Sequence, residues 1–156
     1  MVEAASRSVL AGLKCPDPGV VRECPYNKQC YIDSKYNCSG ARIIYKLECS
    51  LCEASYLGTS GHTAHKRCSE HVEALINGNE SYAMTRHFKQ EHPQWNSNSG
   101  LQPFTMSLVK GPNIKGNLQR YLGEALLIWE STKKGDKVLN ARGEWGRACL
   151  KRLAIV

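Results

Sequence analysis

Two pairs of side chains in this sequence have the types and spacing of metal ligands. Cys49 and Cys52 are separated by two residues, and His87 and His92 by four. Two thiolates and two imidazoles make a complete tetrahedral set for Zn²⁺. Residues 53–86 form a longer spacer than a simple zinc finger uses, so the chain must fold back for the pairs to meet. We predict one structural zinc site here; the alternative for the histidines is an ordinary surface helix end.

Four further cysteines stand in a segment rich in proline and asparagine, which is typical of loops. They are Cys15, Cys24, Cys30 and Cys38. Their spacing is irregular, but such a segment has too little apolar content to order by burial alone, and a metal would supply the order. We therefore predict that residues 1–40 are a cysteine-rich appendage that could hold a second zinc ion. Residues 41–156 then form the main domain, with Cys68 as a small buried residue and Cys149 as a spare thiol.

The chain has 8 cysteines in 156 residues, which also permits a disulfide framework. The first fourteen residues lack the unbroken apolar run of a signal peptide, and no stretch is apolar and long enough to span a membrane. We therefore expect an intracellular, reducing environment with no membrane partner, in which clustered Cys and His favour zinc. A secreted, disulfide-rich protein is the alternative.

The chain is basic, with a formal net charge of +7 and a pI near 9.0. Residues 131–156 contain seven Lys and Arg against only Asp136 and Glu144. Lys and Arg displace counterions from a phosphate backbone, so this segment suits nucleic acid, with DNA expected and RNA not excluded. A solvated basic face is the alternative.

The alternation of apolar residues predicts the elements that must position these groups. β-Branched and aromatic runs predict strands, and apolar residues at helical spacing predict helices. The result is an α+β fold with a small, three-stranded, mainly antiparallel sheet flanked by helices. The expected strands are residues 43–48, 54–58 and 104–109; the expected helices run from Ser60 or Thr63 to Asn77, from Ser81 to before Pro93, and over 117–130, the last amphipathic and followed by a basic loop at 133–136.

Two tyrosines and one arginine recur at equal spacing across the first two expected strands and the following helix. Tyr45 ends Ile43-Ile44-Tyr45, Tyr56 opens Tyr56-Leu57-Gly58 eleven residues later, and Arg67 comes after another eleven. His71 lies one helical turn beyond Arg67, on the same face. This pattern resembles the GIY-YIG nuclease family, although Ile43 stands where the family has glycine and Leu57 where it has isoleucine.

The resemblance implies a catalytic role for each matching residue. Tyr45 would be the general base for the attacking water, Arg67 would grip phosphate oxygens in bidentate fashion, and Tyr56 and His71 would position the water or phosphate. Farther along the chain, Glu124 matches the metal-binding glutamate, which would hold Mg²⁺ or Mn²⁺. Asn140 matches the late asparagine of the family.

The cysteines between the two expected strands indicate which group of the family the sequence resembles most. The run Cys49-Ser50-Leu51-Cys52-Glu53-Ala54-Ser55-Tyr56-Leu57-Gly58-Thr59 is similar to the endonuclease domain of Penelope-like retroelements, with a zinc knuckle inserted in the nuclease fold. The resemblance implies a metal-dependent endonuclease that nicks DNA in the nucleus, with a reverse transcriptase as a partner within a retroelement. The alternative is a catalytically inactive, zinc-stabilised module that binds nucleic acid.

Overall fold

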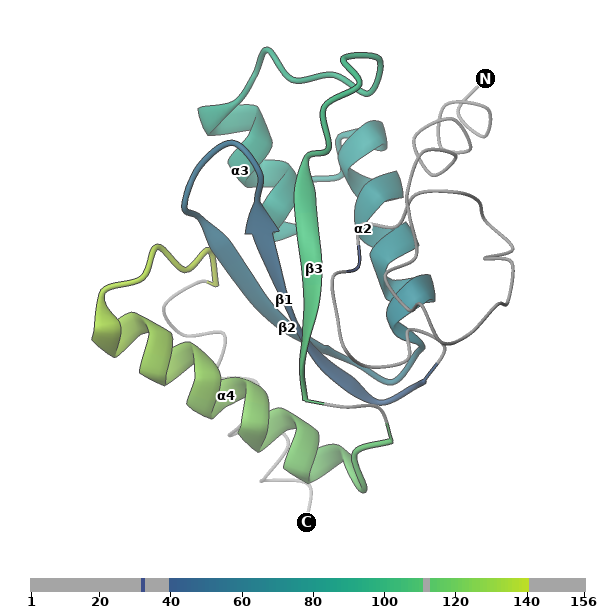
Figure 1. The fold of residues 1–156 in the computed structure, drawn as a ribbon, viewed down its shortest axis with the longest axis vertical. Helices are drawn as coiled ribbons and strands as arrows, with labels where there is room; N and C mark the ends of the chain where they lie inside the picture. Colours follow the sequence, from purple (N-terminus) through teal and green to yellow (C-terminus); the bar gives the residue numbers. More distant parts are fainter. Residues whose placement is uncertain (1–31, 33–39, 111–112, 141–156) are drawn as a thin grey trace.

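The computed structural model describes residues 32, 40–110 and 113–140, which form an α+β fold around one sheet (Figure 1). The sheet has three antiparallel strands in the order β2-β1-β3. The predicted fold class, with a three-stranded antiparallel sheet and flanking helices, is therefore confirmed. The described elements are β1 (Ile43–Cys49), β2 (Ser55–Ser60), α2 (Ala64–Asn77), α3 (Ala83–Glu91), β3 (Phe104–Lys110) and α4 (Asn117–Lys134).

The central strand β1 is buried along one face, at Ile43, Tyr45, Leu47 and Cys49, whereas the other face changes from buried Ile44 through half-buried Lys46 to exposed Glu48. Tyr45 and Leu47 point into the main core together with buried residues of α2 and α3. Ile44 points to the other face, where its Cδ1 lies 2.7 Å from the position that a Cβ on Gly123 of α4 would occupy. Alternate residues of one strand thus reach the two regions where the helices pack.

Helices α2 and α3 pack on each other and present their apolar residues to the core. The Thr63 side chain caps α2 by accepting a hydrogen bond from the Lys66 backbone N–H at 3.2 Å, and Gly78 ends it in the left-handed conformation, with φ of 68°. Both ends agree with the sequence prediction, and Cys68 is buried as expected. Helix α3 begins at Ala83, with Tyr82 rather than Ser81 before its first turn.

Helix α4 is longer than predicted. It continues to Lys134 and ends at Gly135, so the prediction of a basic loop at 133–136 was wrong for Lys133 and Lys134. Its apolar residues divide between two faces: Ile128 is buried, whereas Leu118, Leu122, Leu126 and Trp129 are exposed. The helix packs closely on Ile44 at Gly123, where no side chain intervenes.

Several predictions fall outside the described residues. They concern Cys15, Cys24, Cys30, Cys38 and Cys149, together with the basic segment after Asn140. The second zinc site and the division at residue 40 therefore stay predictions. In the part of the chain that the structure describes, no helix combines the length and apolar character needed to cross a membrane.

Candidate functional site

A chain of hydrogen bonds links three of the predicted catalytic side chains. The Nε of Arg67 donates to the Tyr45 hydroxyl at 2.9 Å, and this hydroxyl lies 2.8 Å from Nε2 of His71. Because Arg67 can only donate, Tyr45 accepts from it and uses its own proton toward His71. His71 must then be neutral and carry its proton on Nδ1. Arg67 thus donates to Tyr45, and Tyr45 donates to Nε2 of His71.

The local fold brings these residues together from β1, β2 and α2. Tyr45 pairs with Gly58 across the antiparallel strands, and Tyr56 lies two residues before Gly58. The rings of Tyr45 and Tyr56 have their centroids 6.3 Å apart. One turn of α2 separates Arg67 from His71, so both reach the Tyr45 hydroxyl from the same helix face. Both tyrosines, the arginine and the histidine therefore share one site.

His71 is enclosed by aromatic rings. Its ring centroid lies 5.5 Å from that of Tyr45, 5.9 Å from Tyr56, 5.2 Å from Tyr82 and 6.4 Å from Phe104. Burial and the positive charge of Arg67 together lower the pKa of His71 to about 3. The imidazole is therefore neutral at physiological pH, as the hydrogen-bond chain requires.

Arg67 connects the buried tyrosine to the protein surface. Its side chain is 23% exposed, and its Nη1 donates to Glu70 at 2.7 Å. The guanidinium also lies 5.5 Å from the ring centroid of Tyr82. The sequence analysis did not identify Glu70 or Tyr82 as site residues. The spacing of Arg67 and Glu70, three residues apart on a helix, was the available signal for the ion pair.

Tyr45 is held in its protonated form. It is completely buried, and burial is the main cause that raises its pKa above the usual value. The neighbouring Tyr56 and the charge of Glu124 act in the same direction, whereas Arg67 opposes them.

Glu124 and Asn140 occupy different positions relative to the tyrosines. Glu124 is half-buried on the face of α4 that packs toward β1 and β2. Asn140 lies beside β2, where its Oδ1 accepts from the Leu57 N–H at 2.9 Å and its Nδ2 donates to the Leu57 carbonyl at 2.7 Å. Asn140 thus fixes the strand that carries Tyr56. Neither of these two hydrogen bonds goes to a predicted catalytic residue.

The four predicted zinc ligands meet at one place. The ligand atoms of Cys49, Cys52, His87 and His92 all lie within 4.8 Å of one another, so the group could hold a metal ion such as zinc. Zinc bonds of about 2.0 to 2.3 Å separate tetrahedral ligands by roughly 3.3 to 3.8 Å, which is close to this spacing. The predicted fold-back of residues 53–86 therefore occurs through α2 and α3.

Individual contacts fit a bound metal. The Sγ of Cys52 lies 3.3 Å from Nε2 of His87, and the Ala54 backbone N–H points to the same sulfur at 3.5 Å. Nε2 of His92 is buried and has no hydrogen-bond partner among the described residues, which a metal ligand bond would remedy. Cys49 and Cys52 are not joined in a disulfide. Both are free cysteines, which a metal could bind as thiolates.

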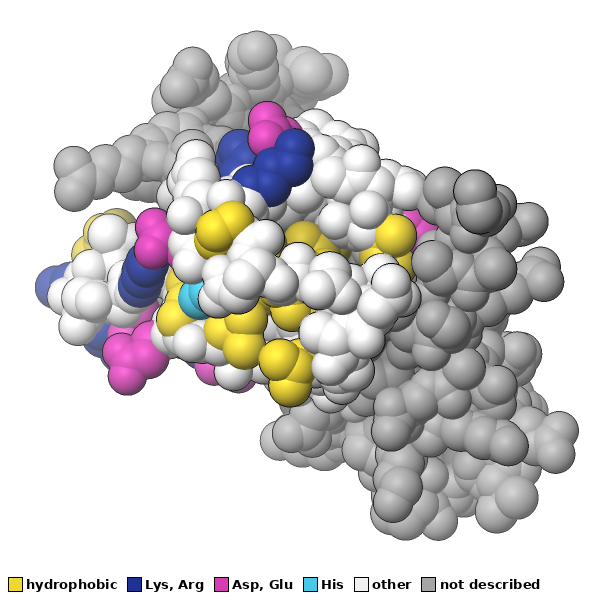
Figure 2. Space-filling view, turned by 90° about the horizontal axis from the view of Figure 1, so that it is seen from above, with side chains coloured by type: hydrophobic (Ala, Val, Ile, Leu, Met, Phe, Trp, Pro, Cys, Tyr) yellow, Lys and Arg dark blue, Asp and Glu magenta, His cyan; other side chains and the backbone are white. Residues whose placement is uncertain are grey.

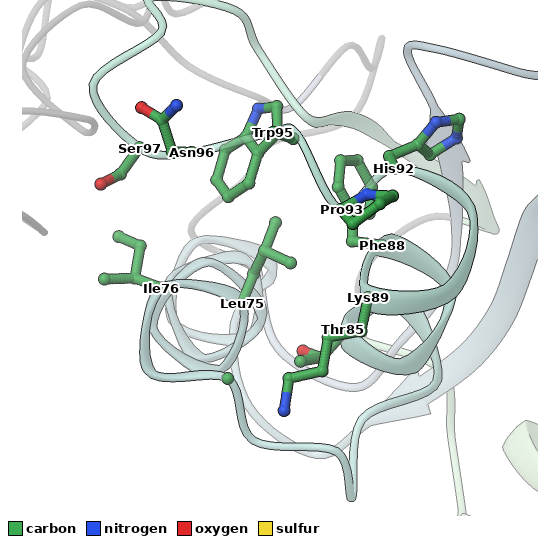
Figure 3. Close-up of a pocket in the computed structure, with 11 residues that line it drawn as sticks. Leu75, Ile76, Thr85, Phe88, Lys89, His92, Pro93, Trp95, Asn96 and Ser97 are labelled. Atoms are coloured by element: carbon green, nitrogen blue, oxygen red, sulfur yellow. The ribbon is translucent and has the colours of Figure 1, made fainter.

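The metal-ligating group and the tyrosine site are separate. Tyr45 and Cys49 lie four residues apart on β1, a distance of about 13 Å along a strand. Beyond the metal ligands, a pocket of about 320 Å³ opens between α2, α3 and the loop after α3 (Figure 3). It includes Thr85, His92 and Trp95 but none of the tyrosine-site residues. From above, this end of the molecule gathers hydrophobic side chains around a histidine (Figure 2).

Comparisons with known proteins give no match to a family model, a curated protein or a solved structure. The resemblance to GIY-YIG nucleases therefore depends on the residues themselves and stays a hypothesis. Its residues are nevertheless distributed over four elements of the fold, so their proximity is a property of the folded chain rather than of local sequence.

Proposed function

We propose that this protein is a metal-dependent endonuclease of the GIY-YIG type, which hydrolyses phosphodiester bonds in DNA. The observation that supports this most is the hydrogen-bond chain from Arg67 through Tyr45 to His71, packed against Tyr56. A partly exposed guanidinium bonded to a completely buried phenol suits charge stabilisation on a phosphate.

The protein's own residues divide the work of phosphodiester hydrolysis. The bonds to Tyr45 and Glu70 occupy two of the five N–H donors of Arg67, so the others can bind phosphate oxygens. Tyr45, oriented by Arg67 and His71, positions the attacking water and is the general base. Neutral His71 accepts the hydrogen bond from Tyr45 and so orients its hydroxyl. Tyr56 closes one side of the site.

Glu124 would hold the catalytic Mg²⁺ or Mn²⁺. A half-buried carboxylate that influences Tyr45 electrostatically has the oxygen ligands that these cations require. When bound, the cation lowers the pKa of water and neutralises charge on the phosphate. The same charge would oppose the rise in the Tyr45 pKa that burial and Glu124 cause.

Zinc at Cys49, Cys52, His87 and His92 would serve structure. It would tie the connection between β1 and β2 to α3, which follows the helix that carries Arg67 and His71. A fixed strand pair keeps Tyr45 and Tyr56 in register. From the resemblance to the endonuclease domain of Penelope-like retroelements, we also propose that the protein acts in the nucleus together with a reverse transcriptase.

The second candidate is a zinc-stabilised nucleic-acid-binding module without cleavage. The full burial of Tyr45 and its raised pKa favour this candidate, because a protonated, enclosed phenol is a poor base. Ile43 is also completely buried where the family has glycine. Both candidates use the same zinc group and basic charge, so cleavage itself must distinguish them.

The decisive experiment is nicking of supercoiled plasmid with Mg²⁺ or Mn²⁺. We expect the unmodified protein to nick, and Glu124→Ala and Tyr45→Phe to lose at least about 100-fold in rate, since each removes a group that acts on the reacting atoms. Glu130→Ala removes an exposed carboxylate from the same helix and should keep full activity. Undiminished nicking by Glu124→Ala would defeat the site; DNA binding without any nicking would favour the module.

A further inference from the structure

A buried arginine on α4 is not explained by the tyrosine site. Arg120 is only 6% exposed, and its hydrogen bonds go to neutral groups: Nη2 donates to the Asn117 side chain at 3.0 Å and to the Tyr121 hydroxyl at 3.4 Å. Within the described residues it forms no ion pair with a carboxylate. Taking a cation out of water is costly unless hydrogen bonds or an anion compensate it, so an anionic ligand would stabilise this guanidinium.

Part of this guanidinium still has bonding capacity. The Nε of Arg120 is buried and has no hydrogen-bond partner among the described residues. Nη2, which shares an edge with Nε, already donates to Asn117 and Tyr121, whereas none of the described hydrogen bonds uses Nη1, so an anion that reaches Nη1 could accept from it. The free donor therefore points to the class of ligand, a phosphate or carboxylate.

Gly61 lies beside Nη1 of Arg120. A Cβ at position 61 would lie 3.3 Å from Nη1 and 3.9 Å from Nη2, whereas Gly61 itself is exposed. A larger residue there would place its side chain against Nη1 from the solvent side. We call this group of residues, Arg120, Gly61, Asn117 and Tyr121, the Arg120 recess.

The recess is next to the proposed active site. Arg120 and Glu124 are one turn apart on the inner face of α4, about 6 Å along the helix axis. Gly61 follows directly after β2, the strand whose Gly58 packs against Tyr45. Helix α4 thus turns Arg120 and Glu124 inward together with Ile128, while Leu118, Leu122 and Leu126 are exposed.

We infer that the Arg120 recess binds a backbone phosphate of the nucleic-acid strand, adjacent to the phosphate held at Arg67 and Glu124. This inference rests on the proposed function for its ligand, because a nucleic-acid strand supplies phosphates at regular intervals along the same surface. The recess then positions the strand, while Arg67 and Glu124 act on the phosphodiester bond.

The test is DNA binding by the full, zinc-containing chain over a salt series, without Mg²⁺ or Mn²⁺. Arg120→Gln should weaken binding about tenfold and reduce the slope of log K against log salt by about 0.9, the effect of one lost phosphate contact. Lys89→Gln removes an exposed positive charge on α3 and should leave the slope unchanged. Equal slopes for the original protein and Arg120→Gln would overturn the inference.

A second arm keeps the result independent of folding defects and of cleavage. Gly61→Ala retains Arg120 but fills the recess, so it should reproduce the weaker binding with an unchanged thermal melt. Duplexes with one neutral methylphosphonate, scanned along the strand, should include a position that weakens the original protein about tenfold and Arg120→Gln not at all. Equal effects at every position would reject the recess. Absence of nicking with these binding results would reject only the nuclease.

Discussion

Gly58 lies against the phenol of Tyr45. A Cβ at Gly58 would come within 2.6 Å of both Cζ and the hydroxyl oxygen of Tyr45, closer than nonbonded atoms approach, and within 2.9 Å of the Tyr56 ring. The glycine that ends Tyr56-Leu57-Gly58 therefore has a physical role. It gives the Tyr45 ring room between the two strands, where the hydroxyl meets Arg67 and His71.

Gly58→Ala should displace Tyr45 and abolish nicking. Overpacking a buried site costs about 1 to 3 kcal/mol, so we expect a folded but less stable protein, measured by thermal unfolding beside the plasmid assay. Gly100→Ala is the control, since nothing lies within 4 Å of its Cβ and only its positive φ of 71° would cost about 1 kcal/mol. Normal nicking by Gly58→Ala would contradict this role of the glycine.

Asn140→Ala should destabilise the protein more than a surface substitution does. Its amide makes two hydrogen bonds to Leu57, and losing both leaves backbone groups of β2 unsatisfied, at a cost of about 1 to 3 kcal/mol. Chemical denaturation measures the change, with the exposed Asn98→Ala as control. A loss of nicking with unchanged stability would instead indicate that Asn140 acts on the substrate.

The sequence predicted the strands, the helices and the metal-ligating group well because each has a local signature. Mainly apolar runs predict the strands at residues 43–48 and 104–109. A pair of cysteines followed by a pair of histidines is a common set of zinc ligands. The strand register then brings Tyr45 opposite Gly58, as two paired strands require.

The sequence could not predict features that depend on which faces meet. Periodicity shows that α4 is amphipathic, but it does not show that α4 approaches β1 at Gly123, so that Ile128 is buried while Leu122 and Leu126 are exposed. Tyr82 contributes to the enclosure of His71 from the start of α3, far from the tyrosine motif. Likewise, the bonds of Asn140 to Leu57 arise only when the chain returns to β2.

Removal of the metal should unfold or loosen the hairpin of β1 and β2. We expect the purified protein to contain one or two equivalents of zinc, and Cys52→Ser to contain one fewer and to melt at a lower temperature, because zinc binding is coupled to folding. Zinc analysis and thermal unfolding test this. Cys68→Ala removes a buried thiol outside the metal-ligating group and should keep all the zinc. Equal zinc content in the unmodified protein and Cys52→Ser would refute the site.

Stability should fall steeply in mild acid because of His71. Its pKa is about 3 in the folded protein and 6.5 in the unfolded chain, so the unfolded state binds a proton that the folded state does not. The stabilisation is complete above pH 6.5 and is lost as the pH falls toward 3, by about 1.4 kcal/mol per pH unit.

His71→Gln isolates this effect, since glutamine can still accept the hydrogen bond from Tyr45 but does not titrate. Between pH 6.5 and pH 5.0, we expect the unmodified protein to lose about 2 kcal/mol more free energy of unfolding than His71→Gln. The comparison cancels acid release of zinc, because both proteins keep Cys49, Cys52, His87 and His92. Parallel pH profiles for the two proteins would mean that His71 is reached by solvent and can be protonated in the folded state, and the enclosed Arg67–Tyr45–His71 chain would then be wrong.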